Sequence, residues 1–425
     1  STPLYSSAAS DVYKRQSRLD MLPIVVRDIF LLASRSQLRL VTIFPMDPEL
    51  SLPDSADVAI IGAGIIGIAT ARELLRRGRS VTLIDPEPLS GATWAAAGML
   101  APVAEVTWDQ ERLYPLMVDA AALYPGFVAD LPDSGYRTTE TLVCAGDGAD
   151  REFLTQLAGL QESMGMAVEP ITSRQARRME PALGPSIAGA MHIPGDHQVD
   201  PRRLGPALFE QVKAHPNFRH VAVRVDSVDV KGRVVHCSDS SSGRHPGITA
   251  ESIVIAAGLN TNDVLPDEHQ LPLRPVYGDV IRLRVPEEIR PLLTATVRAV
   301  VQGRPVYLVP REDGELVVGA TSRENAMAGV SAGGVFELLR DAHHIAPGVW
   351  ECEVVETIAR ARPGSPDDTP MVGEIAPGVV VSTGYSRHGI LLTPLGAQAT
   401  TACVMGEDHP SLAAMDPARF TSLQG

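Results

Sequence analysis

Three glycines and one acid in the first quarter of the chain have the types and spacing that bind a nucleotide. Gly62, Gly64 and Gly67 follow the apolar run 58–61 at GxGxxG spacing, and Asp85 ends the next apolar run. In such a turn the first glycine allows a tight bend, the second lets backbone approach a pyrophosphate, and the third lets a helix lie close to a sheet. A carboxylate after the second strand accepts hydrogen bonds from a ribose and repels a 2′-phosphate. The pattern predicts a pocket for an adenine dinucleotide without that phosphate.

The elements around these residues form a strand–helix–strand unit. Residues 58–61 predict a strand buried on both faces, residues 65–77 carry apolar side chains at helical spacing, and Ser80 to Ile84 predict a second strand. The N-terminus of the helix offers free N–H groups and a positive dipole end to phosphate, so Ile66 in its first turn is a predicted cofactor-binding residue. An isolated GxGxxG can also be a tight turn without a ligand. Both strands, the helix and the acid in register favour the dinucleotide.

Length, charge and cysteine usage limit the class of protein. The 425 residues exceed the roughly 250 to 300 that one core usually serves, so two packed domains are expected. A net charge of −14 and a pI near 5.3 disfavour nucleic acid and anionic membrane as partners. The four cysteines are scattered without a CxxC pair, so we predict neither a zinc site nor a disulfide framework, and no other metal site. A cytoplasmic protein is expected.

Residues 1–45 differ from the rest of the chain. A start rich in serine and alanine leads into an apolar stretch that charged residues interrupt, so no span of about 18 apolar residues remains. A basic start and an A-x-A cleavage site, which mark a secretory signal, are missing from this segment. We expect residues 1–45 to be a non-native or disordered extension, with the native chain starting at Met46.

The run SGATWAAAGMLAPVAE, residues 90–105, carries small residues that let backbone pass close to a flat ring system. A helix packed tightly through its alanines is the alternative. A run of this kind after such a strand–helix–strand unit resembles the D-amino-acid oxidase superfamily of FAD-dependent oxidoreductases. Its AAAGMLAP core resembles most closely the glycine oxidases of thiamine biosynthesis. This resemblance, which covers about residues 56–405, implies that Thr93, Ala97, Gly98 and Met99 lie along the flavin and that Met99 also faces the substrate.

Further segments carry the same resemblance toward the dinucleotide. HQVDPRRLGPALFEQV, residues 197–212, has an Asp-Pro start typical of a capped helix, and in the family this helix returns the chain to the cofactor domain. The resemblance implies that Val225 contacts adenine and that the strand 252–257 closes over the dinucleotide through Ala257 and Gly258. Helices are also predicted at 109–131 and 172–179, and strands within 218–235 and at 273–285 and 379–382.

Two segments would hold the substrate carboxylate. VYLVPREDGELVVGAT, residues 306–321, predicts a hairpin that turns at Asp313-Gly314. Its YLVPR and GAT parts resemble glycine oxidases, which implies that Tyr307 points toward the carboxylate rather than packing in a core. The RPG-x-PD pattern in residues 356–373 implies that Arg362 binds the carboxylate instead of being a solvated charge. A guanidinium can do so through two parallel hydrogen bonds.

The segment TGYSRHGILLTPLGA, residues 383–397, follows a last predicted strand. A helix beginning near His388 would direct its N-terminus at the flavin, where negative charge develops on reduction. The resemblance places Arg387 at the edge of the pocket, as a predicted catalytic residue with Tyr307, Arg362 and Met99. It also implies that four residues line the flavin ring: His388, Gly389, Ile390 and Leu391.

The chain departs from the family pattern at residues near the pocket. Where a tryptophan and a glycine are expected before the Arg-Pro pair, the chain has Ile358 and Arg360. Where the family tends to have GHYRNG, the chain has GYSRHG, with Tyr385, Ser386 and His388 as the changed residues. We therefore expect the polarity and size of the pocket to differ from those of the family.

The predicted fold is α/β, with an FAD-binding Rossmann-like domain interleaved with an antiparallel-sheet α+β substrate domain. We assign residues 46–110, 195–262 and 352–425 to the discontinuous FAD-binding domain, and residues 111–194 and 263–351 to the substrate-binding domain.

The resemblance implies that non-covalent FAD oxidises glycine or a similar small amino acid to an imino acid, while O2 is reduced to H2O2. The imine would supply the thiazole moiety of thiamine, with a thiazole synthase as its acceptor, and the protein would be a homo-oligomer. No Ser-His-Asp, Cys-His or paired-carboxylate pattern indicates another chemistry. Two alternatives stay open: a D-amino-acid or sarcosine oxidase or dehydrogenase of the same superfamily, and an FAD-binding subunit without turnover of its own.

Overall fold

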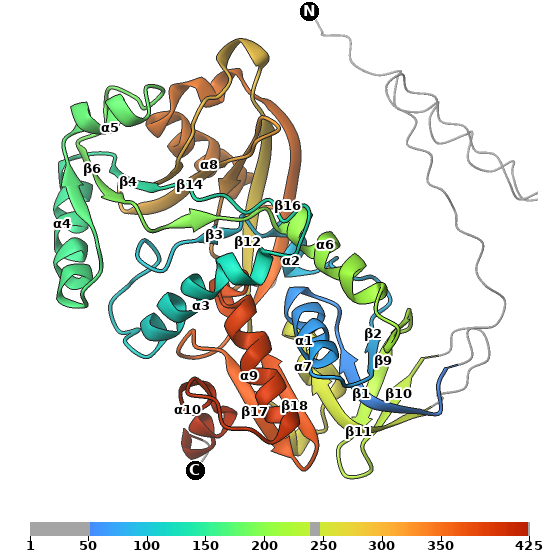
Figure 1. Ribbon diagram of the computed structural model, residues 1–425. Coiled ribbons are helices and arrows are strands. Elements are labelled where there is room, and N and C mark those ends of the chain that lie inside the picture. The colour runs from blue at the N-terminus through green and yellow to red at the C-terminus, as the bar shows by residue number, and fades with distance from the viewer. Residues whose placement is uncertain (1–51, 239–246, 326, 424–425) are drawn as a thin grey trace, which may run out of the picture. The chain divides into compact units, whose positions relative to one another are not determined.

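A computed structural model describes residues 52–238, 247–325 and 327–423 (Figure 1). All of them belong to one compact unit that holds two large sheets. The extension predicted at residues 1–45, and the start predicted at Met46, lie outside the described residues. No helix in the described ranges is long and apolar enough to span a lipid bilayer.

The first sheet is built around the strand that leads into the glycine turn. β1, Ser55–Ile61, pairs in parallel with β2, Val81–Ile84, on one side and with β11, Gly247–Ile255, on the other. The strand order is β17-β18-β11-β1-β2-β8, and β10 and β9 branch from β11. The other strands are β8 Phe218–Val221, β9 Val225–Asp229, β10 Val234–Cys237, β17 Met371–Ala376 and β18 Val379–Thr383. Residues 58–61 are buried, as their continuous apolar run predicts for a strand with both faces covered.

Helices cover the first sheet where the sequence predicts them. α1, Ile65–Arg76, lies between α6, Pro201–Lys213, and α9, Thr393–Met405 (Figure 1). α6 begins as its Asp-Pro start predicts: the Asp200 carboxylate accepts a backbone N–H two residues along, at 2.9 Å, and Pro201 is the first helical residue. The helices predicted at 109–131 and 172–179 are α3, Leu113–Val128, and α5, Ser173–Met179.

The second sheet has the strand order β16-β12-β15-β14-β13-β4-β6-β5. All its neighbouring strands are antiparallel except β13 and β4. The predicted hairpin turn at Asp313-Gly314 joins β14 to β15. The strands are β4 Thr141–Ala145, β5 Glu169–Ile171, β6 Gly189–Ile193, β12 Arg274–Arg284, β13 Thr296–Val301, β14 Arg304–Pro310, β15 Glu315–Gly319 and β16 Glu353–Gly364.

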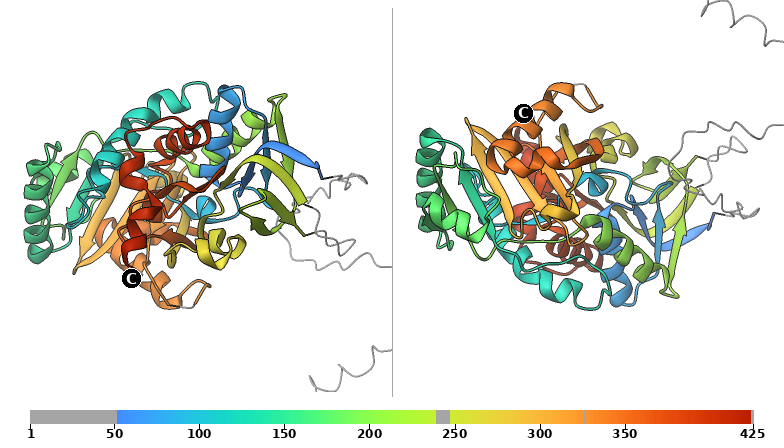
Figure 2. Two further views of the ribbon diagram at one scale, coloured as in Figure 1. Left: turned by 90° about the horizontal axis from the view of Figure 1, so that it is seen from below. Right: turned by 90° about the horizontal axis from the view of Figure 1, so that it is seen from above.

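The remaining elements cover or connect the sheets. α8, Ala332–Ile345, packs on the strands β12, β13, β14 and β15. In both views of Figure 2, the second sheet and α4 lie on one side of α9, and the strands β9 and β10 lie on its other side. The other helices are α2 Ala92–Ala95, α4 Gly148–Ser163, α7 Thr261–Val264 and α10 Leu412–Met415. Two short strands pair, β3 Met99–Leu100 and β7 His197–Gln198. The 3₁₀ turns are η1 Gly258–Asn260, η2 Asp267–His269, η3 Glu287–Ile289, η4 Pro347–Glu351, η5 Ser386–His388 and η6 Pro417–Leu423.

The assignment of segments to two domains stays a prediction, because both sheets lie within one compact unit. β16 falls in the segment 352–425, which the sequence assigned to the FAD-binding domain. In the structure β16 pairs with β12 of the second sheet from Glu353 to Gly364. Segment 352–425 therefore contributes strands to both sheets, since β17 and β18 belong to the first.

A methyl group at Gly67 should destabilise the fold. Its Cβ would lie 2.0 Å from the carbonyl oxygen of Gly62, so α1 would have to move away from the turn. Overpacking of this kind costs about 1 to 3 kcal/mol, so we expect Gly67→Ala to lower the thermal unfolding midpoint by several degrees. Gly126→Ala is the control, because Gly126 is exposed in α3 and its Cβ would contact nothing within 4 Å. Equal midpoints for the two variants would contradict the close approach.

Candidate active site

The glycine turn between β1 and α1 has two packed glycines and one open one. Gly62 has φ +100°, and a Cβ there would lie 2.5 Å from the carbonyl oxygen of Ala256. A Cβ at Gly67 would collide with Gly62, as described above. A Cβ at Gly64, in contrast, would have the Thr93 hydroxyl, at 3.7 Å, as its nearest neighbour. The middle glycine therefore borders the open space that its predicted approach to a pyrophosphate requires.

The first turn of α1 presents backbone N–H groups to that space. The Ile65 N–H donates to the Thr93 hydroxyl at 3.1 Å, whereas within the described ranges the N–H groups of Ile66 and Gly67 have no acceptor. N–H groups at a helix N-terminus, together with the helix dipole, bind phosphate oxygens. These residues fit the role that the sequence predicts for them.

Asp85 follows β2 and lies next to the glycine turn. One carboxylate oxygen accepts the Ala63 N–H at 2.7 Å, and the other accepts the Glu87 N–H at 2.8 Å. These bonds fix the orientation of the carboxylate. Each oxygen has two lone pairs, so both can still accept a hydroxyl proton, as binding of a ribose requires.

The segment from Thr93 to Met99 is tied to the start of α6. Gly98 has φ +75°, and a Cβ there would lie 2.0 Å from the carbonyl oxygen of Val199. The buried guanidinium of Arg311 donates to the carbonyl oxygens of Ala97 and Val199 and to the amide oxygen of Gln198. Arg311 therefore links the end of β14 to the segment that is predicted to lie along the flavin.

The residues predicted to contact the other part of the dinucleotide lie beside the glycine turn. A Cβ at Gly62 would lie 2.9 Å from the Cα of Ala257, and the Thr383 hydroxyl donates to the carbonyl oxygen of Gly258 at 2.7 Å. Val225 begins β9 and shares an apolar cluster with Ala257. Contact of these residues with a cofactor stays a prediction.

The helix expected to begin near His388 begins later, at Thr393. Residues 386–388 form the 3₁₀ turn η5, and a further turn follows before α9. Pro394 explains the difference, because it has no N–H to donate to the carbonyl oxygen of Ile390, four residues earlier. That oxygen instead accepts the hydroxyl of Tyr124 from α3 and the N–H of Thr393, the latter at 3.2 Å.

His388 is a buried side chain without a hydrogen-bond partner. It is 1% exposed, and neither ring nitrogen has a partner within the described part of the chain. Burial, assisted by the charge of Arg387, lowers the pKa of His388 to about 4, so the imidazole is neutral at neutral pH. A buried polar group of this kind normally has a partner, which makes this turn a place for a ligand that offers hydrogen bonds.

One face of the second sheet carries Tyr307 in a row of residues that lie directly opposite one another. The row runs from Arg298 through Tyr307, Gly319 and Val280 to Ile358, across β13, β14, β15, β12 and β16. A Cβ at Gly319 would lie 2.3 Å from the Tyr307 hydroxyl, so this glycine gives the phenol its space. Burial raises the pKa of Tyr307, which keeps the hydroxyl protonated and able to donate.

Arg362 extends over a second glycine of this sheet. A Cβ at Gly278 would lie 2.4 to 2.7 Å from three guanidinium atoms of Arg362. The only hydrogen bond that Arg362 makes within the described ranges goes to the carbonyl oxygen of Thr321, at 3.3 Å, and no carboxylate pairs with it there. Arg362 is four residues beyond Ile358 on β16, so it lies on the same face of the sheet as Tyr307. Its positive charge lowers the pKa of Tyr307, against the larger effect of burial.

Met99 and Arg387 reach the same part of the molecule. Met99 packs with Tyr307 in an apolar cluster that includes Val280 and Ile358. Arg387 donates to the Glu105 carboxylate at 3.1 Å, and Arg298 pairs with the other oxygen of Glu105. Of the two arginines among the four predicted catalytic residues, Arg387 thus pairs with a carboxylate, whereas Arg362 pairs with none within the described ranges.

Comparison with known proteins identifies the family. Residues 57–403 match the family described as FAD dependent oxidoreductase. The chain belongs to this family. The glycine oxidase of Geobacillus kaustophilus is 33% identical to the oxidoreductase over 356 residues, which cover 80% of this chain and 90% of the relative. The crystal structure of glycine oxidase from Geobacillus kaustophilus matches it with a TM-score of 0.76 at 31% identity, over 86% of this chain and 98% of that one.

A second kind of relative is longer. The bifunctional protein ThiO/ThiG of a Nostoc species is 31% identical over 354 residues, which are 80% of this chain but 51% of the relative. The oxidoreductase thus spans about half the length of that protein. Family membership confirms three of the expectations from sequence: the fold class, FAD as the cofactor, and FAD-dependent oxidoreductase as the class of enzyme.

The residues present fit FAD. The open space at Gly64, the N–H groups of Ile66 and Gly67 and the carboxylate of Asp85 suit the diphosphate and ribose. At the other end the unpartnered imidazole of His388 suits a ring system that carries hydrogen-bonding atoms. These groups would hold the cofactor.

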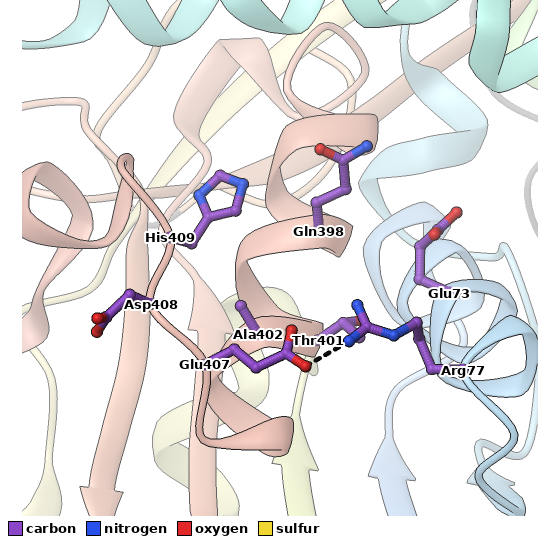
Figure 3. Close-up of a pocket in the computed structure, with 8 residues that line it drawn as sticks. All are labelled: Glu73, Arg77, Gln398, Thr401, Ala402, Glu407, Asp408 and His409. Carbon is purple, nitrogen blue, oxygen red and sulfur yellow. Dashed lines mark hydrogen bonds and ion pairs between the residues drawn. The ribbon is translucent and has the colours of Figure 1, made fainter.

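The hollow drawn in Figure 3 is separate from this site. It measures about 280 Å³ and lies at the C-terminal ends of α1 and α9, where Arg77 pairs with Glu407. A second hollow of about 470 Å³ lies at the far edge of the second sheet, beside β5 and β6. None of the predicted site residues lines either hollow. We place the active site by its hydrogen-bonding groups and glycines instead.

Sequence analysis missed five residues of the site: Glu105, Gly278, Arg298, Arg311 and Gly319. Two of them had a signal. Arg298 is the one charged residue in the apolar strand 296–301, and Gly278 interrupts the alternation of the strand 273–285. The contacts of the others join segments that are far apart in sequence, and no local spacing reports them.

A side chain at Gly64 should expel the cofactor and leave the fold intact. Gly64 has φ −71° and ψ 176°, a conformation that any residue adopts, and its Cβ would meet no protein atom closer than 3.7 Å. We expect Gly64→Val to raise the dissociation constant for FAD by at least about tenfold, since its methyl groups would occupy the pyrophosphate position. Titration of apoprotein by flavin fluorescence measures this, with Gly126→Ala as control. Undiminished affinity would refute the assignment.

A methyl group at Gly278 should displace the guanidinium of Arg362. The displaced atoms are the end of a flexible side chain, so the fold should tolerate Gly278→Ala. We expect acetate, followed through the flavin absorbance, to bind at least about tenfold more weakly, because the guanidinium can no longer form two parallel bonds. Gly159→Ala, at an exposed position of α4 with nothing within 4 Å, is the control. Acetate binding equal to that of the control would show that Arg362 does not bind carboxylates.

Proposed function

We propose that this oxidoreductase oxidises glycine, or a similarly small amino acid, to its imino acid with O2 as electron acceptor and H2O2 as product. The observation that carries the proposal is the guanidinium of Arg362, which pairs with no carboxylate within the described ranges and lies on the same sheet face as Tyr307. On the same sheet face Arg298 is bound to a carboxylate, and Arg311 is bound to three oxygens. Arg362 keeps free N–H groups for a substrate carboxylate.

The residues around this pair favour a small substrate. Met99, Val280 and Ile358 form an apolar surface next to Tyr307, and apolar side chains offer a second polar group nothing to bind. Names of relatives in the family, glycine oxidase in particular, support glycine as the substrate.

The departures from the family pattern bear on this pocket in different ways. Ile358 lies in the row opposite Val280 and takes part in the apolar surface. Arg360 donates to the carbonyl oxygens of Ser90 and Ala359, so its charge is turned toward backbone. The Tyr385 hydroxyl bonds to Ser382 within the core. Of these three, Ile358 is the residue that changes the pocket.

FAD, held at Gly64, Asp85 and His388, would supply the redox chemistry: it would take a hydride equivalent from the substrate Cα, and O2 would take up the two electrons. The chain itself binds and orients the substrate. Arg362 and Tyr307 hold the carboxylate, Tyr307 as a protonated donor, and this fixes which atom faces the cofactor. The apolar surface around Met99 keeps water from the amine, which reacts in its neutral form.

We further propose that the imino acid passes to a thiazole synthase and that the protein is a homo-oligomer. The bifunctional ThiO/ThiG relative supports transfer to a thiazole synthase, because its name describes two functions in one chain. This oxidoreductase spans about half of that chain. Non-covalent FAD and a cytoplasmic location stay predictions. Of the four cysteines, all free, Cys144 and Cys237 are buried.

Removal of the Arg362 charge should abolish most turnover without loss of flavin. Truncating one partner of a buried charged pair costs roughly 2 to 5 kcal/mol, so we expect Arg362→Met to lower kcat/KM about 30-fold to several thousand-fold. Arg360→Met is the matched control, because Arg360 lies two residues away on β16 and binds backbone carbonyls.

The substrates to compare are glycine, sarcosine and D-alanine, with anaerobic bleaching of the flavin for the reductive step and peroxide yield in air for the acceptor. Reduction fastest with D-alanine or sarcosine would assign the chain to the neighbouring activities of the superfamily. Bound FAD that none of the three reduces would favour a subunit without turnover. Wild-type kcat/KM in Arg362→Met would remove Arg362 from the site.

A further inference from the structure

Glu105 joins two arginines that come from separate parts of the chain. One carboxylate oxygen pairs with Arg298 of β13, and the other accepts from Arg387 of η5 at 3.1 Å. The Glu105 side chain is 12% exposed and that of Arg298 17%. Although burial opposes ionisation, the two guanidinium charges hold the pKa of Glu105 down to about 2. The carboxylate is therefore charged, and both of its oxygens are occupied.

This cluster borders the proposed carboxylate site. Arg298 lies directly opposite Tyr307 in the β13–β14 pair, so their side chains stand next to each other on the same face. The Arg298 guanidinium is also 3.6 Å from the sulfur of Met99. Arg298 is therefore a cationic group next to Tyr307 that a second acidic group on the substrate would meet.

The cluster holds charges of both signs. Arg298 and Arg387 are positive and Glu105 is negative, while Asp368 lies 3.6 Å from the Arg387 guanidinium and 3.8 Å from that of Arg274. The charge of Arg298 also acts on Asp196, whose pKa burial raises to about 7. His388, which also lies near Glu105, is neutral at neutral pH. The loop that ends at Glu105 is fixed by Asp196, whose carboxylate accepts the N–H groups of Val103 at 3.1 Å and Ala104 at 2.7 Å. The position of Glu105 is thus set by buried contacts.

We propose that Glu105 is a specificity-determining residue, which occupies Arg298 and Arg387 so that Arg362 alone binds the substrate carboxylate and amino acids with one acidic group are selected. The proposal rests on the proposed function, since that function defines the carboxylate site. Glu105 acts by binding Arg298 and Arg387 and not by touching the substrate, so it is not itself a catalytic residue. Its loss would leave Arg298 and Arg387 without their shared carboxylate and create a second anion-binding position next to Tyr307.

Two variants change the cluster charge in opposite directions. Glu105→Gln leaves one positive charge unmatched, and Arg298→Gln leaves one negative charge unmatched. The probes are acetate and malonate, which carry one and two carboxylates, titrated into the FAD-loaded protein and followed by flavin absorbance. The quantity measured is the acetate Kd divided by the malonate Kd. This ratio measures how much the second carboxylate contributes to binding. Effects on binding of the first carboxylate cancel, because both ligands carry it.

We expect the ratio to rise by at least about tenfold in Glu105→Gln and to fall by a similar factor in Arg298→Gln. At an effective dielectric near 20, the gain or loss of a unit charge within several ångströms has an effect of at least this size. Glu105→Asp keeps the charge and should keep the wild-type ratio. Glu111→Gln, which makes the same charge change on an exposed side chain six positions along, should leave the ratio unchanged.

Equal ratios in wild type, Glu105→Gln and Arg298→Gln would overturn the proposal. A change of the ratio in the same direction in both variants would also overturn it, because the two substitutions change the charge of the cluster in opposite directions. Thermal midpoint and flavin content are measured for each variant, and if Glu105→Gln does not fold, the direction of the shift in Arg298→Gln decides. Anion binding needs no turnover, so a wild-type protein that binds acetate but is reduced by no amine would refute the proposed function separately.

Discussion

Close approach of backbone without an intervening Cβ is the constraint on which this structure depends. Gly62 packs against the residue that follows β11, and a Cβ there would lie 2.5 Å from the carbonyl oxygen of Ala256. Gly67 of α1 packs against the turn itself, and its Cβ would lie 2.0 Å from the carbonyl oxygen of Gly62. The second sheet uses the same device, because Gly278 and Gly319 leave room for the Arg362 guanidinium and the Tyr307 phenol. Glycines thus shape both the cofactor side and the substrate side of the site.

The arginines of the site differ in their partners, and this difference determines the electrostatics of the site. Arg298 and Arg387 share one carboxylate, while Arg311 binds only neutral oxygens, and burial lowers the pKa of Arg311 to about 10. A buried charge is tolerated only where partners replace its lost hydration. Arg362 lacks such a carboxylate within the described ranges and makes one hydrogen bond there, so an incoming anion can neutralise its charge.

Much of the fold was predictable because its signals are local. The glycine spacing, the Asp-Pro start of α6 and the Asp313-Gly314 turn each act over a few residues, and the structure has all three where the sequence predicts them. The helix expected at His388 was wrong, because Pro394 has no N–H to donate to the carbonyl of Ile390, and α9 begins only at Thr393. The Tyr124 hydroxyl and the Thr393 N–H bond to that carbonyl instead. The Glu105 cluster could not be predicted, since its members come together only when the loop after β3, strand β13 and turn η5 meet. Placement of the cofactor-contacting residues stays a prediction.

The order of strands in the first sheet has a consequence for biosynthesis. β1 begins at Ser55, its neighbour β11 lies at residues 247–255, and β18, which pairs with β11, lies at 379–383. Pairing between segments so distant in sequence is slow, because long loops must close before any contact rewards them. A ribosome must therefore release the chain from β1 through β18 before this side of the first sheet can form. Cofactor capture is therefore an event of maturation, open to competition from aggregation and proteolysis while the early strands wait for the late ones.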